Sequence, residues 1–158
     1  MQEDGNKPTR ILVPTDFSSS ANIAVSTAAA FANAFGSAIY LLHVIPMLPI
    51  VPEPGYPAMI FPEQEYLADA KRYADQKLLA SAKILLSEGI EATFGTEVGN
   101  DVVGNIMTTL KRERSDLLVI STHGLSGWRP IVFGSIAEQV TKLVECPVLL
   151  LRTPKSNT

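Results

Sequence analysis

Short apolar segments alternate with longer segments of helical periodicity along the whole chain. Five of the short segments have the length of strands, and most of them are almost continuously apolar. Such runs are typical of strands buried on both faces of a parallel sheet. The predicted strands are Arg10 to Pro14, Ala38 to Ile45, Ala92 to Val98, Leu117 to Ser121 and Val148 to Arg152.

Two long helices are predicted between the first three strands. Glu63 to Glu88 has the clearer pattern, because its apolar residues fall at three- and four-residue spacings and Gly89 follows as a stop. The alanine-rich segment from Ser19 to Phe35 has apolar residues on every face and is followed by Gly36. That pattern indicates a well-buried helix.

Two shorter helices complete the alternation. Asn100 or Asp101 is expected to cap a helix that runs to about Arg114, and a last helix is expected over Ser135 to Val144. The resulting order βαβαβαβαβ predicts an α/β fold, with an open parallel sheet and helices on both of its faces. In such sheets ligands bind beyond the carboxyl ends of the strands, where the strand order reverses.

The length of 158 residues is that of one domain. Within it we expect a flexible N-terminal tail over residues 1–8, a long proline-rich loop over 46–62 and a C-terminal tail over 153–158. Loops as long as 46–62 are uncommon in compact domains and tend to be functional.

Composition and charge narrow the classes of protein. The net charge of −3 argues against a general nucleic-acid binder, which needs a basic face. Cys146 is the only cysteine, so the chain cannot form an internal disulfide and a reducing compartment is expected. We find neither a signal peptide nor an apolar run long enough to span a bilayer. These features predict a cytoplasmic protein without a membrane partner.

The strongest chemical signal follows the fourth strand. The residues STHG end at Gly124, and nine residues later Gly134 and Ser135 lead into the last helix. Glycines allow the backbone to approach a ligand closely, and the amides at a helix start favour phosphate oxygens. Ser135 and Glu138 also have the spacing of a capping box, so Ser135 is expected to cap the helix, bind phosphate, or do both.

The spacing of this loop resembles the glycine signature of the universal stress protein family. The match covers Gly124, Gly134 and Ser135 with the nine-residue gap intact, whereas Ser121 stands where the signature begins with glycine. The resemblance extends over nearly the whole chain. It includes ILVPTDFS from Ile11 to Ser18, LLHVIP from Leu41 to Pro46, and the segment from Ser135 to Leu151.

The resemblance to nucleotide-binding members of that family implies a Rossmann-like sheet with strand order 3-2-1-4-5 and an ATP site where the first and fourth strands meet. The adenosine end would lie against Pro14, Thr15 and Asp16, and the backbone of Val44 would face the adenine. The ligand would be ATP, ADP or AMP, with Mg²⁺ as a companion ion rather than a metal held by the protein. Ribose and phosphates would be surrounded by Ile120, Ser121, Gly124, Gly127, Gly134, Ser135 and Ile136.

Two of these residues have alternative interpretations. Asp16 has the position of an N-terminal cap for the helix that follows it. If the family glycine at Ser121 is used for a positive φ, a serine there costs on the order of 1 kcal/mol. If that glycine is used for close approach, a small hydroxyl is tolerated or bonds the ligand.

The remaining reactive side chains are weaker candidates. His43 and His123 are expected in different loops and lack the cysteines or carboxylates of a metal site. Cys146 is expected to be a small buried hydrophobe. Trp128 and Arg129 either cover the phosphates or form an exposed loop tip. The segment after the first strand has no glycine, so a flavodoxin-like phosphate loop is excluded, and a Walker loop is absent.

Two functions remain. The first is a nucleotide-dependent sensor or regulator in the stress response, at most a slow ATPase because no general base or nucleophile stands out. The second is a nucleotide-free interaction module whose glycine loop is structural. In both cases the last strand, Val148 to Arg152, would be an exposed apolar edge, and the resemblance implies a homodimer that pairs through it, with a further protein partner still unidentified.

Overall fold

The computed structural model of the protein describes residues 7–47, 63–122 and 135–152. Its core is a five-stranded parallel sheet with the order β3-β2-β1-β4-β5, as the sequence and the family resemblance predict. The strands are β1 (Arg10–Pro14), β2 (Ala38–Ile45), β3 (Ala92–Val98), β4 (Leu117–Ser121) and β5 (Val148–Leu151). Most of the predicted N-terminal tail and of the 46–62 loop, and the whole predicted C-terminal tail, lie outside the described residues.

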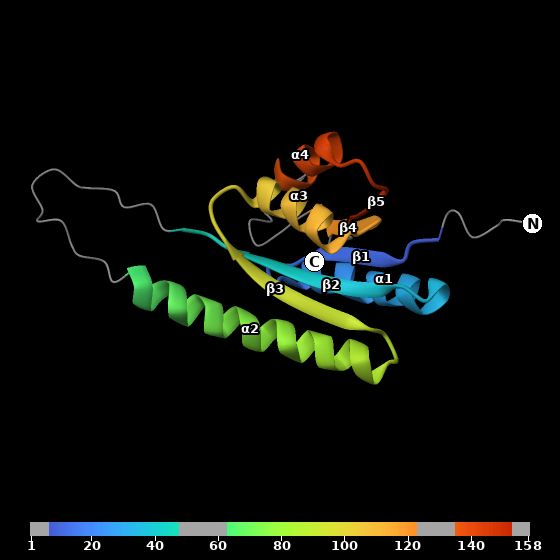
Figure 1. Cartoon of the computed structure of the whole chain (residues 1–158), viewed down its shortest axis with the longest axis horizontal. Coiled ribbons are helices and arrows are strands. Elements are labelled where there is room, and N and C mark those ends of the chain that lie inside the picture. Colours follow the sequence, from blue (N-terminus) through green and yellow to red (C-terminus); the bar gives the residue numbers. More distant parts are fainter. Residues whose placement is uncertain (1–6, 48–62, 123–134, 153–158) are drawn as a thin grey trace, which may run out of the picture.

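Helices cover both faces of the sheet (Figure 1). The first two pack on one face, α1 against β1 and β4 and α2 against β2 and β3, and α3 and α4 pack together on the other. Predicted and observed ends agree to within one residue or so, because caps and glycines fix them locally. The helices are α1 (Ser19–Phe35), α2 (Glu63–Ser87), α3 (Val102–Glu113) and α4 (Ser135–Leu143).

Alanines bring α1 close to the sheet. Ala24, Ala28 and Ala32 recur at four-residue spacing on one side of the helix and are buried. The helix ends at Gly36, whose φ of 73° is left-handed and whose N–H donates to Ala32 O at 2.8 Å. Glycine adopts this conformation at little cost, which explains the stop that the sequence predicted.

The sheet separates two apolar clusters because side chains alternate along each strand. Ile11, Ile39 and Val119 belong to the cluster under α1 and α2. Leu12, Leu42, Leu118 and Ile120 belong to the cluster under α3 and α4. The three inner strands are therefore buried on both faces, as their continuous apolar runs predicted.

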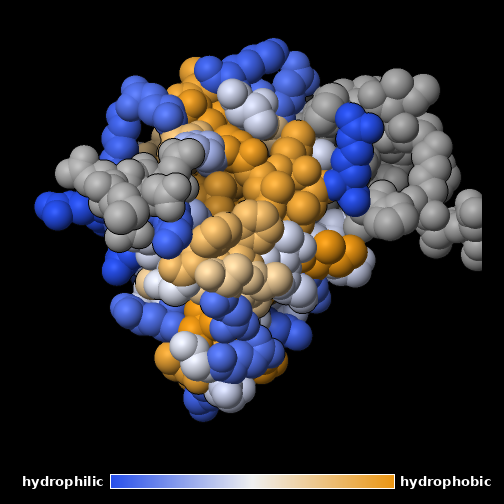
Figure 2. All heavy atoms as spheres, turned by 90° about the vertical axis from the view of Figure 1, so that its right-hand side faces the viewer, coloured by the Kyte–Doolittle hydropathy of each residue, from blue (hydrophilic) through white to orange (hydrophobic). Residues whose placement is uncertain are grey.

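The two ends of the sheet differ in character. Figure 2 shows the edge formed by the amino ends of the strands, where apolar residues gather in the middle of the face. Large exposed apolar side chains sit at the helix ends on this side, including Phe35 and Leu143. The opposite end, where the strands finish, carries polar loop residues such as Asp16 together with exposed apolar ones such as Met47 and Val98.

Candidate functional site

The strand order reverses between β1 and β4, which makes the carboxyl end of this pair the expected ligand position. Leu12 pairs with Leu118, so the two strands run level and end near one another at Pro14 and Ser121. The structure thus brings together the first predicted group, around Asp16, and the second, around Ser121.

The loop between β1 and α1 is held by its own polar groups. Thr15 N–H donates to Leu42 O at 2.8 Å, and Phe17 N–H donates to Thr15 Oγ1 at 3.0 Å. Asp16 Oδ1 accepts from Ser18 N–H at 3.0 Å. These bonds turn the chain sharply between strand and helix, and they hold Asp16 at the ligand edge.

The alternative interpretation of Asp16 as a helix cap is wrong. Ser18 is the N-cap of α1, with extended backbone and a side-chain oxygen that accepts from Ala21 N–H at 3.1 Å. Asp16 lies two residues earlier and bonds the cap itself. Ser18 is the cap because it directly precedes the first helical residue, which places its side-chain oxygen next to the unpaired N–H groups of the first turn.

Phe17 has a left-handed backbone with a φ of 64°. This conformation costs a bulky residue roughly 1–2 kcal/mol, so neighbouring contacts must compensate it. The Phe17 ring stacks on His43 with centroids 4.4 Å apart, and it meets the edge of Tyr73 at 6.1 Å. His43 belongs to β2, as the predicted strand from Ala38 to Ile45 requires, and the expectation that it lies in a loop is wrong.

Val44 also lies inside β2, because that strand continues to Ile45. Backbone groups along a strand alternate between its two sides. Leu42 O accepts from the β1 side, and Ile45 O accepts from Gly99 N–H on the β3 side. The N–H and C=O of Val44 therefore point to the β1 side, beyond the last residue of β1. The expected direction of the Val44 backbone is thus compatible with a ligand in this position.

Ser121 is the last residue of β4, where it pairs with Leu151. Its backbone is that of a strand and has no positive φ. The conformational cost considered for a serine at this point therefore does not arise. Ile120 is buried, and the next residue, Thr122, donates its N–H to Leu151 O at 2.8 Å.

Ser135 and Ile136 are the first two residues of α4 and both are exposed. Glu138 Oε1 accepts from Lys142 Nζ at 2.7 Å, one turn further along the helix. The remaining predicted site residues, Gly124, Gly127 and Gly134, lie outside the described residues, as do His123, Trp128 and Arg129. The capping box and the phosphate loop therefore stay predictions.

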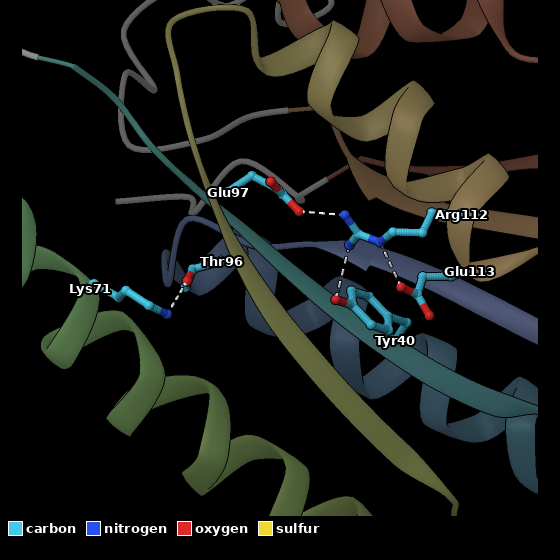
Figure 3. Close-up of polar contacts among 6 residues, drawn as sticks. All are labelled: Tyr40, Lys71, Thr96, Glu97, Arg112 and Glu113. Carbon is cyan, nitrogen blue, oxygen red and sulfur yellow. Dashed lines mark hydrogen bonds and ion pairs between the residues drawn. The ribbon is translucent and has the colours of Figure 1, made fainter.

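Among the described residues, the most extensive charged network joins α3 to β2 and β3, away from the carboxyl end of β1 and β4 (Figure 3). Arg112 donates to Glu97 at 2.6 Å, to Glu113 at 2.9 Å and to Tyr40 Oη at 3.3 Å. Bonds to Glu113 and Glu97 raise the pKa of Arg112, whereas burial raises that of Tyr40. Each of the three guanidinium nitrogens of Arg112 donates to a group of the protein, which is typical of a structural network rather than a ligand site.

A pocket of about 370 Å³ lies at the amino edge, between the end of α3 and the turn before β5. Its lining includes Leu110, Arg114 and Cys146. The Cys146 thiol is half-buried against the apolar cluster, and this burial raises its pKa. A raised pKa favours the protonated thiol, and the half-buried position of Cys146 agrees only in part with the expected buried hydrophobe.

Two kinds of feature are absent from the described residues. Residues 7–47, 63–122 and 135–152 hold no cluster of three or more His, Cys, Asp or Glu side chains suited to a metal ion. No helix within them combines the length and the apolar character needed to cross a membrane.

Comparison with known proteins assigns this chain to one family. The model of the universal stress protein family matches residues 8–152. Universal stress protein MJ0531 of Methanocaldococcus jannaschii is 31% identical over 148 residues, covering 92% of this chain and 83% of the relative. The solved structure of hypothetical protein MJ0577 is 28% identical with a TM-score of 0.80, covering 96% of this chain and all of that one. Universal stress protein UspA of Lactobacillus plantarum shares the fold at 20% identity, with a TM-score of 0.79 over 93% of this chain and 99% of that one. The chain belongs to the universal stress protein family.

Proposed function

We propose that this protein binds an adenine nucleotide, ATP in the first place, at the carboxyl end of β1 and β4. The observation that carries the proposal is that three predicted contacts lie at one end of the sheet: the Asp16 loop, the backbone of Val44 that points to the β1 side, and the end of β4 at Ser121. A carboxylate suits ribose hydroxyls, and paired backbone groups suit the edge of adenine.

The phosphate half of the site rests on the loop that ends at Ser135. The amino end of α4 belongs to the ligand edge, because the helix leads back across the sheet to β5 (Figure 1). Its N–H groups and dipole favour phosphate oxygens. Mg²⁺ would accompany the phosphates and neutralise part of their charge. ADP and AMP are the alternative ligands for the same contacts.

Solved relatives support the class of ligand. One universal stress protein was solved in complex with cAMP, and another, from Archaeoglobus fulgidus, in complex with dAMP. Each is 22% identical to this chain, with TM-scores of 0.66 and 0.60, so the likeness concerns the fold. A fold that accommodates adenine nucleotides elsewhere supports the same use of this edge.

The cellular role that follows is a cytoplasmic, nucleotide-dependent regulator in the stress response, which presents different loops to a protein partner with and without ligand. Slow hydrolysis is compatible with this role. A second candidate is a nucleotide-free interaction module. Within the described residues β5 pairs with β4 alone, so its other edge is available for the homodimer that both candidates expect.

Calorimetric titration with ATP and Mg²⁺ tests the proposal. Asp16→Asn keeps the oxygen that accepts from Ser18 but loses the charge, and Gly134→Val alters the predicted phosphate loop. We expect binding by the parent and at least about tenfold weaker binding by both variants, since a hydrogen bond to a charged group contributes about 1.5–3 kcal/mol.

Asp69→Asn is the matched control, because Asp69 is exposed on α2 and pairs with Arg72. It should bind like the parent. A well-folded parent that binds no adenine nucleotide would overturn the proposal and leave the interaction module as the function.

A further inference from the structure

Asp16 is flanked by two residues that contact the same side chain on another strand. Thr15, on one side, bonds His43 through its carbonyl, and Phe17, on the other, stacks on the His43 ring. We propose that His43 is a positioning residue that holds Asp16 in place for the nucleotide. The inference rests on the proposed function, and it adds a residue that has no expected contact with the ligand.

The hydrogen bond fixes the peptide before Asp16. His43 Nδ1 lies 2.8 Å from Thr15 O. A carbonyl oxygen only accepts, so Nδ1 carries the proton and donates it. The N–H of Thr15 donates to Leu42 O at 2.8 Å, so β2 holds this residue by both of its backbone groups.

The ring fixes the residue after Asp16. The planes of Phe17 and His43 are inclined by 28°, which is a stacked arrangement, and Tyr73 approaches Phe17 edge-on at 89°. Phe17 needs such support because its φ of 64° is unfavourable for a bulky side chain. Without the stack, its backbone would relax and the Asp16 side chain would turn with it.

Histidine supplies both contacts from one ring. Phenylalanine could stack on Phe17 but could not donate to the Thr15 carbonyl. Asparagine could place an amide N–H close to the position of Nδ1 but could not stack. The imidazole of His43 therefore links both neighbours of Asp16 to β2. A variant that loses either the hydrogen bond or the stacking contact keeps only one of these two links.

The support itself can be tested without a ligand. Amide hydrogen exchange, followed by NMR, reports how often the N–H groups of Phe17 and Ser18 lose their acceptors Thr15 Oγ1 and Asp16 Oδ1. We expect His43→Ala to accelerate exchange at both amides by about tenfold or more relative to Ile39→Ala. Ile39 lies on the same face of β2, so this control removes a buried side chain without touching the loop. Equal exchange in the two variants would overturn the inference.

The consequence for binding is tested by titrating the same proteins with ATP and with inorganic tripolyphosphate. We expect His43→Ala to weaken ATP binding by about tenfold, and His43→Phe and His43→Asn each to weaken it by about threefold. Tripolyphosphate binding should stay at the level of the parent, because that ligand has no adenosine end for Asp16 to contact.

The outcomes separate the two proposals. If the parent binds no ATP, the proposed function fails, and the inference falls with it. If the parent binds ATP and folded His43→Ala binds it equally well, only the positioning role of His43 is overturned. Equal loss of ATP and tripolyphosphate binding in His43→Ala, shared by Ile39→Ala, would also overturn it, because the effect would then come from general destabilisation.

Discussion

The hydroxyl of Tyr40 lies against Gly95 of the neighbouring strand, at the point where any larger residue would place its Cβ. Tyr40 is buried, and Arg112 donates to its Oη at 3.3 Å, so the ring cannot swing away freely. This contact explains why β3 contains a glycine in the middle of a strand, where glycine is usually unfavourable.

We therefore predict that Gly95→Ala lowers the free energy of unfolding by about 1–2 kcal/mol through overpacking. In a Tyr40→Phe background the nearest ring atom lies 3.3 Å from the new Cβ, so most of the penalty should disappear. Urea unfolding of the four proteins in this cycle gives the coupling. Additive effects of the two substitutions would contradict the predicted collision.

Asp116 should make the stability depend on pH in the acid range. Burial acts to raise its pKa, but hydrogen bonds from Arg10 and Thr9 outweigh burial and lower the pKa below the usual 3.8. A lowered pKa means that the folded state favours the carboxylate. Its contribution is complete above about pH 4 and is lost as pH falls through the folded pKa.

Asp116→Asn should thus reduce stability by about 1–2 kcal/mol at pH 7, a value discounted for partial exposure. The difference from the parent should shrink as the pH falls below about 4. Thermal unfolding between pH 2 and 7 measures it, and a constant difference over that range would contradict the prediction.

The cap of α1 gives a local test. Ser18→Ala removes the oxygen that accepts from Ala21 N–H and should cost about 1 kcal/mol of stability. Ser19→Ala, at the exposed first helical residue, is the matched control and should cost less than about 0.5 kcal/mol. Comparable losses in both variants, measured by thermal unfolding, would show that the cap does not carry the effect.

A proline at Leu150 tests pairing through the sheet edge. Pro147 O and Leu151 O accept from β4, so the backbone groups of Val148 and Leu150 point outward by alternation. We expect Leu150→Pro to block an antiparallel partner without breaking the β4–β5 ladder, because proline lacks the outward N–H.

Sedimentation at micromolar concentration should accordingly give a dimer for the parent and a folded monomer for Leu150→Pro. Leu149→Pro is the contrasting variant, since its N–H faces β4, and it should unfold more readily. If the parent protein sediments as a monomer, the prediction of a homodimer is wrong.

Ser121→Gly addresses the departure from the glycine signature. Because Ser121 has strand backbone, glycine offers no conformational benefit and should lower stability by about 0.5–1 kcal/mol. ATP affinity should change by less than about threefold, a difference below 1 kcal/mol. A gain of tenfold or more in the titration would instead mean that the serine side chain obstructs the ligand.

The parts of this structure that could be predicted are those that depend on residues adjacent in the sequence. The continuous run from Ala38 to Ile45 and the stop at Gly36 depend on burial and backbone freedom of adjacent residues, and both were correct. The reversal of strand order between β1 and β4 followed from the alternation of strands and helices, together with the family resemblance.

The contacts that escaped prediction join residues far apart in the chain. The rings of Phe17, His43 and Tyr73 meet although they come from a loop, a strand and a helix. No spacing in the sequence predicts these contacts. The left-handed backbone of Phe17 has no sequence signal either, since that conformation usually belongs to glycine or asparagine. The Arg112 network likewise depends on how α3 lies over β2 and β3.

The alanines of α1 act as a spacer of fixed thickness between helix and sheet. Ala24, Ala28 and Ala32 leave no room for a larger side chain, because protein interiors are packed as densely as crystals. A larger side chain at any of these positions would push α1, together with Ser18 and the neighbouring loop, away from β4. The separation between α1 and β4 at the carboxyl end of the sheet is therefore set by three buried methyl groups and not by the loop residues themselves.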